Sequence, residues 1–484
     1  MAYTMNTRAQ TIMLPPVIED YVALDAPVRI YDAFVDSLDF NALGISLQPN
    51  PHGGQDEYYP KDIMKLIIFG YSYGIRSSRK LERACYDNLS FIWLMGGLKP
   101  DFCTIARFRH TYKEAIRRVL KQCVHLCIKL DLISSNMLFI DGSKFRANAS
   151  INNTWTKEKC QKSLKKLEEY IDHLVDETEN IDTQEQDNDT LVKTKEKIQD
   201  KAKLMNKIKD VMADLEISKQ KSLNSTDPDC VNAKSRQGTH ASYNVQSVVD
   251  SKHGLIVHTE AVPHAVDLNQ LSRQIEQATA VLEKKPEHVC ADCGYSSIED
   301  IKDIDADINI VVPSHKQAQE NNGRHPLPAF GKERFTYDAA RDEYVCPENQ
   351  RLSYRRDRSD RAQKYYHCNK LICRNCPNFG DPRQGKCTQS LRGREITRMH
   401  QQDLQDRLEK NYKKPENQSI YALRKQMVEH PFGHMKRNLG AGQFMLRGKA
   451  NVNAEASLLS TCFNISRLTT IVGALALINT LKGI

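Results

Sequence analysis

The stretch FIDGSKFRANAS, residues 139–150, places a carboxylate directly after an apolar run. The four apolar residues Met137–Ile140 are typical of a short buried strand, and Asp141 follows them with a turn-like Gly142-Ser143 pair. An acid in this setting either pairs with a neighbouring base or faces a site at the end of the strand. The choice depends on whether other acids, distant in sequence, arrive in a similar setting.

The size and composition of the chain suit a protein of several domains. Its 484 residues are enough for two or three cores. The net charge of +8 offers excess cation to an acidic partner such as a nucleic acid, although a mild excess also occurs in proteins that bind nothing anionic. Fourteen cysteines without a secretory signal favour reduced thiols or a bound metal over a disulfide framework.

Neither end of the sequence predicts a membrane segment. The opening MAYTMNTRAQTIMLPP lacks an apolar signal core, and residues 471–484 contain too few apolar residues to cross a bilayer. We therefore expect a cytoplasmic protein without a membrane partner, and a packed terminal helix at the end of the chain.

Residues 1–133 show helical apolar spacing, which predicts an all-helical N-terminal domain. Lys61–Tyr73 and Ser78–Tyr86 resemble the two helices of a helix-turn-helix, and a further long helix is expected from Asp101 through Cys123. The candidates for DNA contact are Arg76, Arg79 and Lys80. Two packed helices with solvated charges are the alternative, because the spacing alone is a weak signal.

Residues 155–223 are rich in Lys, Glu, Asp, Gln and Leu. Their apolar positions predict two amphipathic helices joined by the polar tract Asp176–Thr190. We interpret this region as an antiparallel helical hairpin inserted into a second domain that spans residues 134–484.

The segment after the hairpin alternates strand and helix patterns, which predicts a mixed α/β sheet. The expected strands are Tyr243–Asp250, Leu255–Val262, His288–Ala291 and Ile308–Val312, and the expected helices are Asp267–Leu282 and Ser296–Ile304. Ser251–Gly254 has the composition of a tight hairpin turn between the first two strands.

Two further acids are candidates for the same site as Asp141. Asp292 follows an apolar run and precedes a glycine by two residues, so it repeats the pattern around Asp141. If the two strands are neighbours, the carboxylates repel unless one takes a proton or a divalent cation lies between them. Oxygen ligands without nearby histidines favour Mg²⁺ or Mn²⁺ over zinc. For either acid alone, a turn residue at a strand end is the simpler explanation.

The third acid, Glu429, lies in the helical pattern YALRKQMVEHPFGHMKRNLG, with Lys436 two turns along the same face. Pro431 can kink or restart that helix. A single Glu among bases is ordinarily part of a surface ion pair.

In their order along the chain, several blocks resemble insertion-sequence transposases of the DDE class, which have an RNase H-like catalytic domain. The blocks are YYPKDIMKLIIFGYSYGIRSSRKLERACYDN, FIDGSKFRANAS, ADCGYSS and VEHPFGHMKRNLG. The resemblance implies an RNase H-like mixed sheet with helices on both faces, and it assigns the catalytic and metal-binding triad to Asp141, Asp292 and Glu429. It also implies two Mg²⁺ (or Mn²⁺) ions, cleavage of double-stranded DNA at transposon ends, transfer of the 3′-hydroxyl to target DNA, and a nucleoid-associated homo-oligomer.

Related transposases carry a Tyr, Arg, Glu and Lys signature on the helix of the third acid. Tyr421, Glu429 and Lys436 are similar, but Arg424 lies five residues before Glu429 where four is usual, and this leaves its role open. The cations that we expect to hold phosphates are Lys144, Arg146, Arg424, Lys436, Arg437 and Arg447. A nuclease of the same fold that does not rejoin DNA, and a catalytically silent DNA-binding regulator, are the alternative functions.

Residues 325–400 form a cysteine-rich, basic insertion. The pair Cys373 and Cys376 has CxxC spacing, and Cys346 and Cys387 are plausible partners for a structural zinc in a knuckle too short to bury a core. His367 and Cys368 are alternative ligands, and unligated thiols are the alternative to a metal site. The interleaved arginines and tyrosines, Arg355 and Arg356 among them, predict a DNA-contacting arm or a solvated loop.

Overall fold

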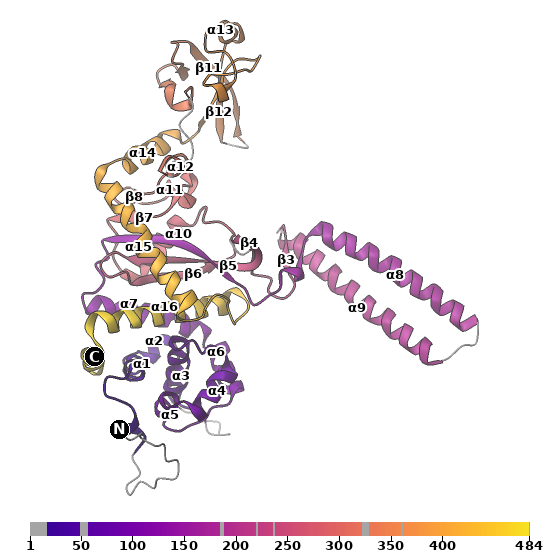
Figure 1. Ribbon diagram of the computed structural model, residues 1–484, viewed down its shortest axis with the longest axis vertical. Coiled ribbons are helices and arrows are strands. Elements are labelled where there is room, and N and C mark those ends of the chain that lie inside the picture. The colour runs from indigo at the N-terminus through magenta and orange to yellow at the C-terminus, as the bar shows by residue number, and fades with distance from the viewer. Residues whose placement is uncertain are drawn as a thin grey trace, which may run out of the picture. The chain divides into compact units, whose positions relative to one another are not determined.

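The computed structural model describes residues 17–48, 57–183, 188–218, 221–235, 238–321, 329–359 and 362–483 (Figure 1). The N-terminal stretch 1–16 without a signal core lies outside the described residues. The chain divides into two compact units. The first comprises Met1–Asp267, Gln274–Lys285 and Gln426–Ile484, and the second comprises Leu268–Arg273 and Pro286–Lys425. The N-terminal helices group with the first unit, and the predicted domain boundary at residue 133 stays a prediction.

The N-terminal part of the first unit is helical, as expected. Its described elements are η1 (Ile18–Tyr21), α1 (Pro27–Asp36), α2 (Phe40–Leu43), α3 (Pro60–Ser72), α4 (Ser78–Asp87), α5 (Leu89–Leu94), α6 (Phe102–Thr111) and α7 (Lys113–Lys129). The expected helix pair is present as α3 and α4. The single long helix expected after Asp101 is wrong, because the chain leaves helical geometry at Tyr112. The Tyr112 ring packs on Phe108 with centroids 4.8 Å apart, and both α6 and α7 keep the apolar periodicity on which the prediction rested.

The sheet of the first unit is built around one long strand, β5. The strands described in this unit's sheet are β1 (Met137–Arg146), β4 (Val231–Ser235), β5 (Gly238–Asp250) and β6 (Ile256–Val262). β5 pairs antiparallel with each of the other three. The turn after β5 is confirmed: the Gly254 N–H donates to the carbonyl of Asp250 at 3.1 Å, and Gly254 has a φ of +68°.

The turn expected at Gly142 and Ser143 is wrong, because both residues continue β1. Their register partners on β5 are Gln246 and Val245, and pairing extends to Arg146. A ladder along the whole length of β1 satisfies its backbone groups, and this outweighs the turn propensity of a Gly-Ser pair. Asp141 therefore lies inside a strand and not at the end of one.

Helix α16 (Lys449–Val472) closes the free edge of β6. Asn464 accepts from the N–H of Ile256 and donates to its carbonyl, both at 2.8 Å, and Asn453 accepts from the N–H of Ala261 at 2.7 Å. Side-chain amides thus replace the strand that an edge would otherwise attract. α7 and α16 both contact β6, and α17 (Ala474–Lys482) follows Gly473 (Figure 1).

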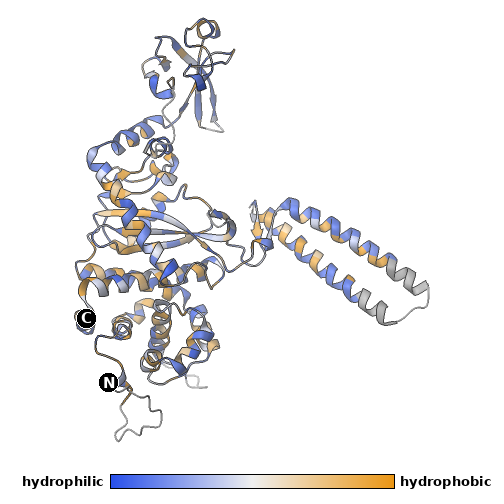
Figure 2. Ribbon diagram, in the orientation of Figure 1, coloured by the Kyte–Doolittle hydropathy of each residue, from blue (hydrophilic) through white to orange (hydrophobic). Residues whose placement is uncertain are grey.

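The predicted helical hairpin has its two helices in α8 (Lys157–Thr183) and α9 (Asn188–Ser218), and its place as an insertion in the second predicted domain stays a prediction. β2 (Thr154–Trp155) and β3 (Leu223–Asn224) pair at its base, so the chain leaves and returns at one short ladder. In the coloured parts of the two helices, hydrophobic positions are interspersed with hydrophilic ones (Figure 2). Most of the tract predicted as a polar connection is helical, and residues 184–187 lie outside the described part of the chain.

The second unit begins with a parallel strand pair, β7 (His288–Cys290) and β8 (Asn309–Val311). Outside the cysteine-rich segment, the unit also contains η3 (Cys293–Tyr295), α11 (Ile298–Ile301), α12 (His315–Asn321), α14 (Gln402–Tyr412) and the first part of α15 (Pro415–Arg437). The helix expected at Ser296–Ile304 is only the four residues of α11. Helix α10 (Leu271–Leu282) begins four residues later than expected. The predicted mixed α/β class is confirmed, and its RNase H-like arrangement stays a prediction.

The cysteine-rich segment of the second unit is a folded sheet. Its described strands are β9 (Thr336–Asp338), β10 (Glu343–Val345), β11 (Arg351–Arg358), β12 (Gln363–Cys368) and β13 (Glu395–Met399), with η4 (Lys332–Arg334), α13 (Lys370–Arg374) and η6 (Pro382–Gln384). Its core consists of Phe335, Tyr344, Leu352, Tyr366, Cys368 and Ile396. The expectation of a knuckle too short to bury a core is therefore wrong, because β9–β13 contribute apolar side chains from both sides of the cysteine-rich stretch.

No single helix in the described parts of the chain is long and apolar enough to cross a membrane. Taken together, α16 and α17 have the length and composition, but they meet at a bend of 111°.

Candidate active site

Asp141 lies on one face of β1 together with Ser143 and Phe145, because side chains alternate along a strand. Helix α15 approaches this face. The Lys436 Nζ donates to the Oγ of Ser143 at 2.6 Å and lies 4.6 Å from the centre of the Phe145 ring. The third sequence block is therefore in contact with the first, although Ser143 and Lys436 are 293 positions apart.

Lys436 also interacts electrostatically with Asp141. Burial lowers the pKa of Lys436, and the negative charge of Asp141 opposes this shift. The ammonium group thus stands within electrostatic reach of the first predicted catalytic carboxylate, in a partly desolvated position.

Glu429 is exposed on α15, two turns before Lys436. The helix continues through Pro431, so the expected break does not separate the two residues. On the same helix, His430 and His434 pack against Phe463 at centroid distances of 5.5 and 5.4 Å. Burial lowers the pKa of both imidazoles, which suits a packing role at neutral pH.

The opposite face of β1 holds a carboxylate that sequence reasoning missed. The Oδ1 of Asp267 accepts from the side-chain amides of Asn244 at 2.8 Å and Gln246 at 2.7 Å. The same oxygen also lies over β1 at Gly142, where a Cβ would be only 2.2 Å away from it. The sequence pattern predicts Asp267 at the start of a helix, but α10 begins four residues later, and Asp267 instead binds the sheet on the face opposite Asp141.

Several predicted phosphate-binding cations gather near the end of β1. The segment after α15 binds along the strand, with the Phe444 N–H donating to the carbonyl of Arg146 at 2.8 Å. Arg447 donates through Nε to the carbonyl of Asn148 at 2.8 Å, and Lys144 donates to the carbonyl of Lys234 at 3.4 Å. The side chains of Arg146, Arg447 and Arg437 are exposed.

Arg76 has a structural position, not an exposed one. Its guanidinium donates to the carbonyls of Gly440 at 2.6 Å and Gln443 at 2.9 Å, and to the carboxylate of Glu455 at 2.8 Å. Arg76 is 8% exposed, so we leave it out of the DNA-contacting residues. Arg79 and Lys80 are exposed on α4.

In the second unit, Asp292 accepts from the N–H of Gly294 at 2.8 Å and so caps η3. Burial raises the pKa of Cys290 to about 12, with Arg424 opposing and Asp292 reinforcing the shift. Burial also raises the pKa of Tyr421 to about 12, again with opposite effects of Arg424 and Asp292. The first part of α15 therefore places Tyr421 and Arg424 in the surroundings of Asp292.

Helix α15 contributes to both units. Tyr421 and Arg424 belong to the second unit with Asp292, and Glu429 and Lys436 belong to the first unit with Asp141. Across the described residues, no group of three or more His, Cys, Asp or Glu side chains is arranged as it stands to hold a metal ion. The three predicted ligands are thus distributed over two compact units.

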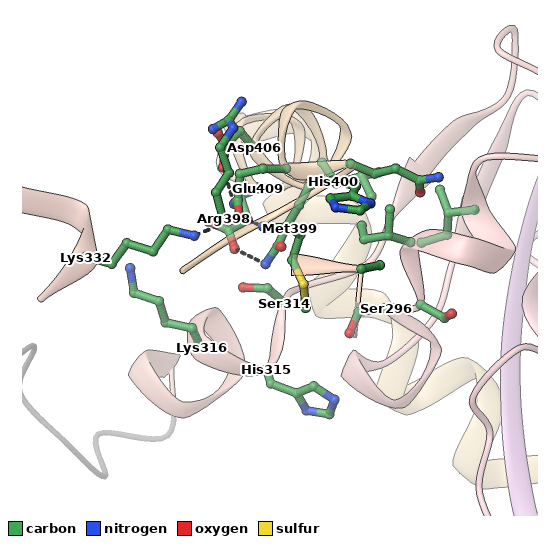
Figure 3. A pocket seen from close by; sticks show the side chains of 18 of the residues that line it. Ser296, Ser314, His315, Lys316, Lys332, Arg398, Met399, His400, Asp406 and Glu409 are labelled. Carbon is green, nitrogen blue, oxygen red and sulfur yellow. Dashed lines mark hydrogen bonds between the residues drawn. The ribbon is translucent and has the colours of Figure 1, made fainter. Parts of the chain in front are cut away.

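A separate cavity of about 740 Å³ lies within the second unit (Figure 3). Its charged residues bind protein groups: Lys332 donates to Gln402 at 2.7 Å, and Arg398 donates to Asp403 at 2.6 Å. The remaining predicted cations of this unit, Arg355 and Arg356, are exposed on β11. Of the tyrosines in this stretch, Tyr354 is exposed and Tyr366 is fully buried in the core of the sheet, and the DNA-contacting arm stays a prediction.

Comparison with known families gives two matches. Residues 16–111 match the family described as Transposase domain (DUF772), and residues 345–469 match the family described as Transposase DDE domain. The second match contains Glu429 and Lys436. Neither the curated proteins nor the solved structures contain a match to the chain. The two family matches occur in the order that the sequence blocks imply, and they identify the chain as a transposase of the DDE-class insertion-sequence family.

Proposed function

We propose that the protein cuts double-stranded DNA at transposon ends and transfers the freed 3′-hydroxyl to target DNA. The observation that carries this proposal is the contact between Lys436 and Ser143 at 2.6 Å. It brings the helix of Glu429, which lies within the matched DDE domain, against the strand of Asp141.

In this proposal an RNase H-like domain uses Asp141, Asp292 and Glu429 to hold two Mg²⁺ or Mn²⁺ ions. Their chemistry fits, since carboxylate oxygens are the preferred ligands of these hard cations. Bound ions of this kind activate a water or a 3′-hydroxyl and stabilise the leaving oxygen of the phosphodiester.

Lys436 has two roles in this proposal, one toward the carboxylate of Asp141 and one toward the DNA. Its hydrogen bond to Ser143 fixes the ammonium group beside Asp141. In that position it orients the carboxylate and attracts the scissile phosphate, which a partly desolvated cation binds more strongly than a solvated one. The exposed Arg146, Arg437 and Arg447 would bind the flanking phosphates.

The proposal is tested with the full-length protein, duplexes carrying the DNA that flanks its gene, and a target plasmid. With Mg²⁺, the wild type should nick the duplex and produce joined plasmid. Asp141→Asn, Asp292→Asn and Glu429→Gln should each lose cleavage by at least about 100-fold, while end binding persists.

Glu416→Gln is the matched control, because Glu416 is an exposed acid in the first turn of the same helix, α15. It should cut and join like the wild type. Cleavage without joined product would contradict strand transfer and favour the alternative, a nuclease that does not rejoin DNA. Full activity in any of the three acid variants would remove that residue from the site.

A further inference from the structure

Five thiols of the second unit lie around one small cavity beside the five-stranded sheet. The cavity has a volume of about 30 Å³, and the cysteines that line it are Cys346, Cys368, Cys373, Cys376 and Cys387. None of them forms a disulfide. The segments that bring them together are the β10–β11 turn, the end of β12, α13 with the residues after it, and the loop before β13.

The turns that carry these thiols present the sulfur atoms to backbone N–H groups. In the β10–β11 turn, the Gln350 N–H donates to the Sγ of Cys346 at 3.3 Å, and the Cys346 N–H donates to the Gln350 carbonyl at 2.8 Å. The Arg394 N–H donates to the Sγ of Cys373, also at 3.3 Å. The two backbone donors thus fix the positions of both sulfur atoms at the cavity.

The chain is shaped to bring Arg394 close to Cys373. Gly393 precedes it with a φ of +91°, and a Cβ there would lie 2.7 Å from the carbonyl oxygen of Cys368. Only a glycine allows this approach. Cys387 is held in turn by its N–H, which donates to the carbonyl of Asn378 at 2.7 Å, two residues after Cys376.

Exposure distinguishes four of the thiols from the fifth, because Cys346, Cys373, Cys376 and Cys387 are partly exposed and Cys368 is buried. Cys387 lines the same cavity as Cys346, Cys373 and Cys376. Cys368 is 2% exposed and belongs to the core of the sheet, against which Cys346, Cys373 and Cys387 pack from its edge. His367 is next to it on β12 and therefore points to the opposite face.

The loop that carries Cys376 and Cys387 lacks a core of its own. Between residues 375 and 394 only Thr388 and Gly393 are buried. So little burial does not offset the entropy of ordering about twenty residues, whereas a metal cross-link can supply the missing free energy.

We propose that Cys346, Cys373, Cys376 and Cys387 bind one structural zinc ion in a tetrahedral site. As the side chains stand, no three of these thiols form a metal-holding group, so binding requires them to turn toward the cavity that they share. The ion fixes the 375–394 loop to the β10–β11 turn. The site is independent of the DNA-cleaving carboxylates.

The full-length protein, purified under reducing conditions and dialysed against metal-free buffer, should retain about one zinc per chain by elemental analysis. Cys373→Ser and Cys376→Ser should lose at least about nine-tenths of it. Cys103→Ser is the matched control, because Cys103 is an exposed thiol on α6, and it should keep the zinc. Cys368→Ser should also keep it.

Two further measurements apply if a variant fails to fold. Wild type reconstituted with Co²⁺ should show the thiolate charge-transfer and ligand-field absorption of a tetrahedral site. A strong chelator should unfold the loop, so that trypsin cleaves it after the exposed residues Arg383, Lys386 and Arg392 while the rest of the chain resists cleavage. A wild type with no more zinc than Cys373→Ser, or with these cysteines joined in disulfides after purification under reducing conditions, overturns the proposal.

Discussion

Arg76 and Glu455 form a buried ion pair, with Nη1 of the arginine 2.8 Å from Oε1 of the glutamate. The Glu455 carboxylate also accepts from the backbone N–H groups of Met445 and Leu446. The pair therefore fixes the turn between α3 and α4 to α16 and to the segment that runs along the end of β1. Arg76, which the sequence predicts as a DNA contact, instead connects the N-terminal helices to α16 and to the end of β1.

Arg76→Met should lower the free energy of unfolding by about 3 to 5 kcal/mol, because it leaves the Glu455 carboxylate buried without its charge partner. Urea denaturation of the full chain measures the change. Lys80→Met, which removes an exposed cation four residues on, should change it by less than about 0.5 kcal/mol. The double variant Arg76→Met with Glu455→Met should be more stable than Arg76→Met. Equal stability of Arg76→Met and the wild type would contradict the interpretation.

Gly142→Ala should destabilise the first unit by about 2 kcal/mol or more, because the new Cβ would meet the Oδ1 of Asp267 at 2.2 Å. Gly433→Ala is the control: a Cβ at this α15 position meets nothing within 4 Å, and it should stabilise by about 0.5 to 1 kcal/mol. Thermal unfolding distinguishes the two. If Gly142→Ala is as stable as the wild type, Asp267 does not press on β1.

Lys436 predicts a pH dependence. Burial lowers its pKa below the ordinary value of 10.5, and Asp141 only partly opposes the shift. Between the folded and unfolded pKa values the unfolded chain binds more protons, so stability from this group rises with pH. As the pH rises towards the ordinary value of 10.5, the wild type should therefore gain stability relative to Lys436→Met, as measured by urea denaturation at each pH. A relative loss over that range would reverse the sign and disprove the burial effect.

Arg79 and Lys80 test the predicted DNA contacts of α4. If each neutralises one phosphate, replacing both by alanine should reduce the slope of log affinity against log salt by about 1.8. Fluorescence anisotropy with end DNA at several salt concentrations measures this slope. Replacing Lys162 and Lys166, which are exposed on α8, should leave it unchanged. An unchanged slope in the α4 variant would place the DNA elsewhere.

The parts of the fold that local pattern determines could be predicted from the sequence. The helices α3, α4, α8 and α9 follow apolar periodicity, and the β5–β6 hairpin follows the turn composition that ends in Gly254. The length of β1 could not be predicted, since Gly142 and Ser143 favour a turn locally and only their ladder with β5 makes them strand. The break at Tyr112 is likewise a result of packing.

The candidate site shows the same division. The motif residues Asp141 and Lys436 could be named from the sequence, and the structure brings Lys436 to the strand of Asp141. Asp267 could not be, because its partners Asn244 and Gln246 lie 23 and 21 positions earlier in the chain, on β5. The cysteine-rich sheet was also missed: its short strands are separated by polar turns, and the core forms only when residues as distant as Phe335 and Ile396 pack together.

The two-residue ladder of β2 and β3 means that the α8–α9 hairpin can be deleted or replaced as a unit. Entry and exit of the hairpin are joined at Thr154–Asn224 and Trp155–Leu223, so a short linker between Thr156 and Ser222 could bridge them without disturbing β1 or β5. The hairpin can thus be shortened, given a different surface or replaced by a reporter domain, while the sheet that carries Asp141 stays unchanged.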